Sequence, residues 1–135
     1  MPERAANLRA ELILKAMIAV ASADGGLEQS ELSLIQQVYQ DQAERPITPE
    51  EIATVSEATT RDGILAELSA AAPVLDRETK EEIIRAAYLT LLADGRIAAE
   101  ERKNLKDIAM ALRVPEIHFG AILEDLALWL SEQKS

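Results

Sequence analysis

The chain contains the same acidic turn twice, and each copy lies between two stretches whose apolar residues recur at helical spacing. Residues 23–27 read Ala-Asp-Gly-Gly-Leu and residues 93–97 read Ala-Asp-Gly-Arg-Ile, an offset of seventy positions. Sliding residues 11–38 onto 81–108 without a gap also matches further apolar and charged positions. The sequence therefore predicts an internal duplication of a helix-turn-helix unit, and the duplicated turn is the first place to look for function.

Strand signals are nearly absent, because aromatic residues make up 3% of the chain and β-branched residues are scattered. We predict an all-α fold, a compact bundle of about seven helices in a single domain over residues 1–135. Thr48, Thr60 and Asp76 each precede an apolar helical pattern and are predicted N-caps. The helix that follows Asp76 is apolar over much of its circumference, so we expect it to be the most buried element.

The composition excludes several classes of function. The formal net charge of −10 argues against a nucleic-acid binder and favours basic partners or hard cations. No cysteine and a single histidine, His118, leave no ligands for a thiolate zinc site and no disulfide. No run of eighteen apolar residues occurs, so we expect no membrane-spanning helix and a cytoplasmic location.

Each turn places an Asp at the end of a helix, where the macrodipole disfavours negative charge by about 0.3–1 kcal/mol. In one interpretation the turns are caps, with the Asp accepting backbone N–H groups and a Glu favouring the start of the next helix. In the other interpretation, a bound hard cation such as Ca²⁺, Mg²⁺ or Mn²⁺ compensates for the unfavourable position of the Asp. The spacing is that of the second half of an EF-hand loop, but the first half is missing, which argues against a high-affinity EF-hand.

If the two turns approach one another, their acids form one patch for a weakly bound cation or a basic protein. The residues of this predicted metal-binding or partner-binding patch are Asp24, Glu28, Glu31, Asp94, Glu100 and Glu101.

The paired Ala-Asp-Gly turns, the apolar residue two positions after each first Gly and the Glu-rich starts of the following helices resemble the TerB-like family. That family includes the tellurite-resistance protein TerB and the N-terminal domain of DjlA-type co-chaperones. The resemblance covers about residues 8–130 and implies a compact all-helical bacterial domain with a role in metal-oxyanion or general stress responses. It implies no catalytic reaction, and it makes Asp24, Asp94, Glu31 and Glu101 candidates for metal or partner contacts. Ser30 stands where the second copy has Glu100, so the two turns are not equivalent.

We expect no enzyme. Paired carboxylates that cleave sugars lie in clefts with stacking aromatics, and this chain has one Trp, two Tyr and one Phe. No serine lies in a glycine-framed elbow, and His118 has no evident partner in the sequence.

Trp129 in the last helix has two interpretations. It either packs on the first helix as part of the core or anchors a partner or a homodimer, where Trp is frequent among binding hot spots. The leading hypothesis is a TerB-like interaction module whose acidic turns contact a hard cation or a basic protein. The alternative is a purely structural helical domain that presents an apolar groove to a partner, with the turns serving only as caps.

Overall fold

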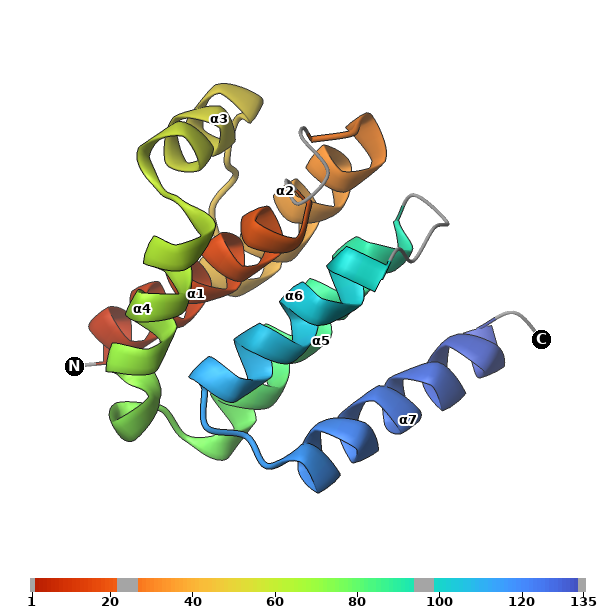
Figure 1. The fold of residues 1–135 in the computed structure, drawn as a ribbon. Helices are drawn as coiled ribbons and strands as arrows, with labels where there is room; N and C mark the ends of the chain where they lie inside the picture. The colour runs from red at the N-terminus through yellow and green to blue at the C-terminus, as the bar shows by residue number, and fades with distance from the viewer. Residues whose placement is uncertain (1, 22–26, 94–98, 134–135) are drawn as a thin grey trace.

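The computed structural model describes residues 2–21, 27–93 and 99–133, with side chains for residues 7–21, 27–93 and 102–133. Within these ranges the chain forms seven α-helices, one short 3-10 helix (Ala72–Val74) and no strand (Figure 1). The α-helices are α1 (Pro2–Ala21), α2 (Gln29–Ala43), α3 (Pro49–Ala58), α4 (Arg61–Ala71), α5 (Arg77–Leu92), α6 (Ala99–Ala111) and α7 (Glu116–Gln133). The predicted all-α bundle of about seven helices is confirmed. None of the described helices combines the length and the apolar character that a membrane crossing requires.

Three helices begin at the N-caps that the sequence predicts. The Thr48 hydroxyl accepts the backbone N–H of Glu51 at 3.1 Å, and the Glu51 carboxylate accepts that of Thr48 at 3.1 Å, which closes a capping box at α3. Thr60 caps α4 through a 2.9 Å hydrogen bond. Asp76 caps α5 by accepting the N–H of Thr79 at 2.8 Å. The hydrogen bonds from Thr79 hold the pKa of Asp76 below its ordinary value, because they stabilise the carboxylate.

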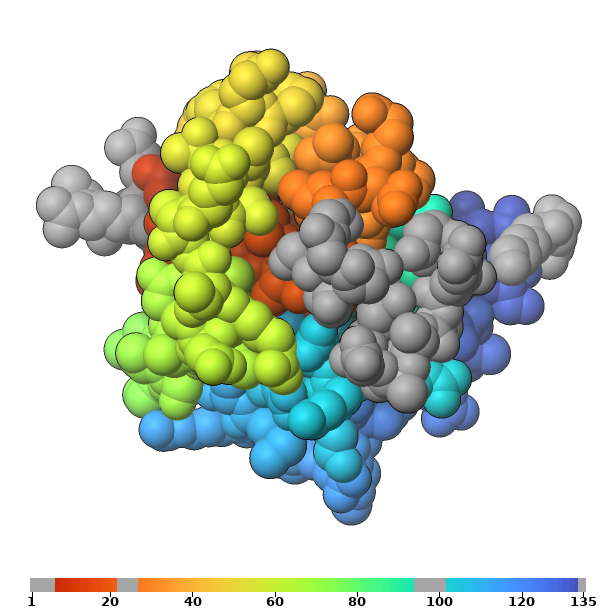
Figure 2. Space-filling view, turned by 45° about the horizontal axis from the view of Figure 1, so that its top comes forward, coloured from red at the N-terminus to blue at the C-terminus, as the bar shows by residue number. Residues whose placement is uncertain are grey.

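The centre of the bundle is the pair α1 and α5, which pack against each other more extensively than any other two helices. Every residue from Ala10 to Ala21 is buried except Glu11 and Lys15. The expectation that α5 is the most buried helix is therefore wrong, because α1 is also contacted by α2, α3, α4 and α6. On the face that Figure 2 shows, only a small part of α1 is visible, next to α2, α4 and α6. By contrast, α5 keeps a partly exposed side that carries Glu82 and Arg85.

Lys15 joins α1 to α4 at the border of this core. Its Nζ lies 2.9 Å from Glu67 Oε1 and 3.2 Å from Glu11 Oε1, and 13% of its side chain is exposed. Burial lowers the pKa of Lys15, but the hydrogen bonds and negative charges of Glu67 and Glu11 together outweigh it, so this pKa lies above its ordinary value.

The last helix, α7, packs mainly against α5 at one edge of the bundle (Figure 1). Ile122 and Leu126 are its buried residues. Three large apolar side chains of α7, Ile117, Leu128 and Trp129, are exposed. This helix therefore shares only a narrow stripe with the core and leaves apolar surface beside α5.

Candidate functional site

The acidic turns that the sequence singles out are only partly described. Asp24 and Asp94 lie outside the described residues, as do the side chains of Glu100 and Glu101. The backbone of α6 places Glu100 and Glu101 in the first turn of that helix. Among the side chains that the structure describes, no three His, Cys, Asp or Glu lie close enough to share a metal ion. The acidic patch and its cation remain predictions.

Glu28 and Glu31, the two acids of the first turn that are described, cap α2. Glu28 is the N-cap residue, and its backbone N–H donates to Glu31 Oε1 at 2.8 Å. The Glu28 side chain accepts the backbone N–H of Glu31 in return, which completes a capping box. Glu31 is only 3% exposed, whereas Glu28 is exposed. A contact of Glu31 with an external partner would require this buried carboxylate to leave its cap.

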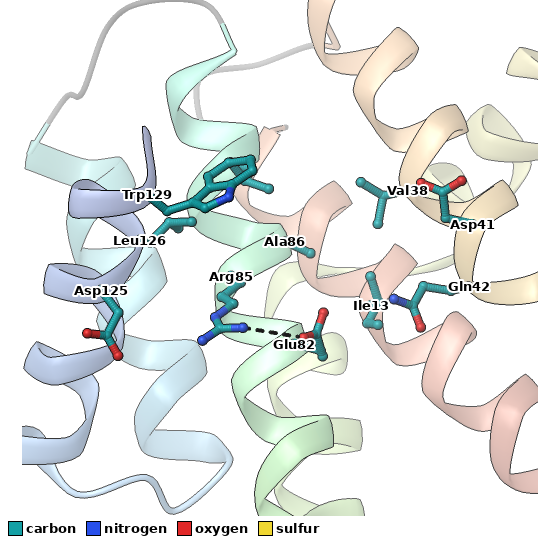
Figure 3. A pocket seen from close by; sticks show the side chains of 11 residues that line it. Ile13, Val38, Asp41, Gln42, Glu82, Arg85, Ala86, Asp125, Leu126 and Trp129 are labelled. Atoms are coloured by element: carbon teal, nitrogen blue, oxygen red, sulfur yellow. Dashed lines mark ion pairs between the residues drawn. The ribbon is translucent and has the colours of Figure 1, made fainter. Parts of the chain in front are cut away.

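A groove of about 350 Å³ runs along α5 between α2 and α7 (Figure 3). Residues from four helices line it: Ile13 of α1; Val38, Asp41 and Gln42 of α2; Glu82, Arg85, Ala86 and Leu89 of α5; and Asp125, Leu126 and Trp129 of α7. In Figure 3, α2 and α7 form the two walls, with α5 and α1 between them. The groove is therefore a product of the tertiary packing of segments far apart in the sequence.

The interior of the groove is apolar and well packed. Ile13 is 1% exposed, Ala86 5% and Leu126 6%. Trp129 stands on the α7 wall with 49% of its surface exposed, so the interpretation in which it packs into the core on the first helix is wrong. An exposed indole above a closely packed apolar floor offers a partner a large contact area at low entropic cost.

The charged groups of the groove are mainly acidic. Arg85 Nη1 lies 3.6 Å from Glu82 Oε1, one helical turn away on α5 (Figure 3). Asp41 on α2 and Asp125 on α7 are both exposed, and neither has an ion pair or a hydrogen-bonded side-chain partner in the described part of the chain. Because the single Arg is already paired, the groove presents two uncompensated negative charges, one on each wall.

Sequence reasoning identified Trp129 but missed the other residues of the groove. A local signal exists on α7, where Asp125 lies four positions before Trp129 and therefore on the same helical face. No local signal connects this face with Asp41, because the two walls come together only when α2 and α7 pack beside α5.

His118 has partners that the sequence did not reveal. Its Nε2 lies 3.0 Å from Glu81 Oε1, and its Nδ1 lies 2.9 Å from Nη2 of Arg77, which is 41 positions away. Its side chain is 20% exposed, so His118 is half-buried. No partner was evident in the sequence, because both partners lie on α5 and reach His118 only in the folded chain.

Comparison of the chain with protein-family models, with curated proteins and with solved structures gave no match. The resemblance to the TerB-like family therefore stays a prediction from the two Asp-Gly motifs of the sequence and their helical context.

Proposed function

We propose that this chain is a non-catalytic interaction module of the TerB-like type that holds an apolar segment of a partner protein between α2 and α7. The observation that carries the proposal is Trp129, half exposed on the wall of a groove whose floor contains Ile13 and Ala86. Tryptophan on such a surface is typical of the anchors of protein interfaces. The groove volume of about 350 Å³ suits a few anchoring side chains rather than a whole domain.

The charges of the groove favour a basic partner. Asp41 and Asp125 lie on opposite walls, and Arg85 is paired with Glu82. An amphipathic helix with an apolar face flanked by Lys or Arg would bury its apolar side chains beside Trp129 and place cations near both aspartates. The net charge of −10 adds a long-range attraction for such a partner.

The arrangement of the helices supports the proposed internal duplication. α2 begins at Gln29 and α6 at Ala99, which the seventy-residue offset equates, so Glu31 and Glu101 occupy the same position in their helices. The helices that precede the two turns, α1 and α5, pack against each other. A role in bacterial stress responses and a cytoplasmic location are proposed on the family resemblance alone.

For the acidic turns we propose the capping role, with a hard cation as the alternative. The capping box between Glu28 and Glu31 supports this choice, because it engages two of the carboxylates of the predicted patch. If the same arrangement holds in the second copy, Glu101 takes the equivalent place at the start of α6.

The experiment that tests the groove uses a fluorescent designed helix of Leu and Lys as the probe, with the same helix built from Leu and Glu as its control. We expect the full chain to bind the Lys helix and not the Glu helix. Trp129→Ala should weaken binding about thirtyfold or more, since hot-spot truncations cost about 2 kcal/mol or more. Asp41→Asn and Asp125→Asn should each weaken it by about two- to fivefold, the effect of an exposed ion pair.

Two matched variants on α7 control for general effects on that helix. Leu128→Ala removes an exposed apolar neighbour of Trp129, and Glu124→Gln removes an exposed charge next to Asp125, and neither residue lines the groove. Equal binding by all variants would contradict the proposal. Sedimentation of the free protein tests for the competing occupant, which is a second copy of this chain. A dimer that Trp129→Ala dissociates would mean that this second copy fills the groove.

A further inference from the structure

A second cavity, of about 390 Å³, is lined by residues of α5, of the connection from α6 to α7 and of α7. Figure 1 shows that the end of α6 and the start of α7 lie near the start of α5. It is lined by Arg77, Lys80, Arg113, Val114, Pro115 and His118. Every titratable residue of this lining is basic, although the chain carries a net charge of −10. Such a local reversal of charge sign is unexpected from composition alone and points to an anionic ligand.

Contacts with α5 and α7 position part of this basic cavity. The 2.9 Å contact between Arg77 Nη2 and His118 Nδ1 fits Arg77 as the donor, since a guanidinium cannot accept. Nε2 of the same ring lies 3.0 Å from Glu81 Oε1 and 3.4 Å from Nε of Arg77. Arg77 Nε also lies 3.6 Å from Glu81. The guanidinium has five N–H donors and is 77% exposed, so donors remain for a ligand while the ring and Glu81 restrict its orientation.

Lys80 and Arg113 supply the uncompensated charge. Neither has an ion pair or a hydrogen-bonded side-chain partner in the part of the chain that the structure describes. Glu116, the first residue of α7, lies 3.7 Å from Nζ of Lys106, which is not part of the cavity lining. Glu81 therefore offsets only one of the three permanent positive charges around the cavity.

Arg113 also occupies a backbone position that ordinarily favours glycine. Its φ is 61°, and its N–H donates to Met110 O at 3.0 Å while that of Val114 donates to Ala109 O at 3.0 Å, which ends α6 in a left-handed turn. Glycine adopts this conformation without the steric cost that a Cβ brings. Gly at this position would therefore stabilise the turn more than Arg does. The side chain of Arg113 has no capping role that accounts for its presence.

We infer that this cavity binds a small phosphate-type dianion, with Arg77, Lys80 and Arg113 as its ligands. Guanidinium groups match the paired oxygens of a phosphoryl group, and an ammonium adds a point charge. A single carboxylate would leave more of this positive charge unneutralised. The site is distinct from the groove between α2 and α7, since the two cavities share no lining residue.

The test is calorimetric titration of the full chain with inorganic phosphate and with glycerol phosphate, at an ionic strength kept constant with chloride. We expect saturable binding, and Arg113→Gly and Lys80→Gln should each weaken it about tenfold, the effect of losing a charged hydrogen bond. Arg113→Gly should fold at least as stably as the wild type, because it relieves the left-handed backbone. Lys103→Gln, an exposed charge on α6 outside the cavity, is the matched control and should change nothing.

Tighter binding of glycerol phosphate would identify a phosphorylated small molecule as the ligand, and tighter binding of inorganic phosphate would identify free phosphate. Heats no larger than those of chloride, or identical affinities for the wild type and both cavity variants, would overturn the inference.

Discussion

The carboxylate of Glu31 accepts the backbone N–H of Glu28 at 2.8 Å, and the two residues close the start of α2 with a reciprocal capping box. This contact gives one of the predicted ligand residues a structural role in its own helix. The two acids at the start of α2 therefore have a structural role in the fold that needs no external ligand.

Replacing Glu31 by Ala should lower the free energy of unfolding by about 1 kcal/mol, because one orphan N–H at the start of α2 loses its acceptor. Glu31→Gln keeps an acceptor at the same place and should cost less. Urea denaturation measures both, with exposed Ser30→Ala as the neighbouring control. An Ala variant as stable as the wild type would show that the capping box contributes nothing.

If the acidic turns are caps, the melting temperature of metal-stripped protein should not respond specifically to Ca²⁺, Mg²⁺ or Mn²⁺. A cation that binds only the native state must raise this temperature. The double variant Asp24→Asn, Asp94→Asn should lose about 1 kcal/mol of stability per site, the usual effect of weakening a cap. A cation-specific rise that the double variant lacks would instead establish the turns as a metal site.

The alkaline stability of the protein should depend on Lys15. Its pKa is raised in the folded state, so its contribution is fully present below its ordinary value of about 10.5 and is lost as the pH rises through the raised value. Denaturation curves between about pH 8 and about pH 11.5 should show a steeper loss for the wild type than for Lys15→Met. Parallel pH profiles would contradict the assigned interaction with Glu67 and Glu11.

Local features of the fold were predictable from the sequence. The caps at Thr48, Thr60 and Asp76 lie within three residues of the N–H groups that they accept, so a short stretch of sequence contains both partners. The helical class follows from apolar spacing in the same way. Which helix is the most buried was harder to predict. The apolar residues of α1 cover more than one face, and they are buried because other helices pack against α1 on several sides.

The candidate sites depend on contacts that no local pattern contains. His118 meets Arg77 across 41 positions, and Asp41 faces the wall of Trp129 only because α2 and α7 both pack beside α5. The exposure of Trp129 decides between its two interpretations. An apolar stripe in the sequence does not by itself determine which residues of a terminal helix remain at the surface.

The most direct test of the groove uses Trp129 itself, because it is the only tryptophan of the chain and its fluorescence reports on the groove alone. The full chain is titrated with an unlabelled helix of Leu and Lys, which contains no aromatic residue. We expect a saturable blue shift of the Trp129 emission, since the half-exposed indole loses water when an apolar face covers it. An emission maximum that stays unchanged at saturating helix, or that shifts equally with the Leu and Glu helix, would contradict it.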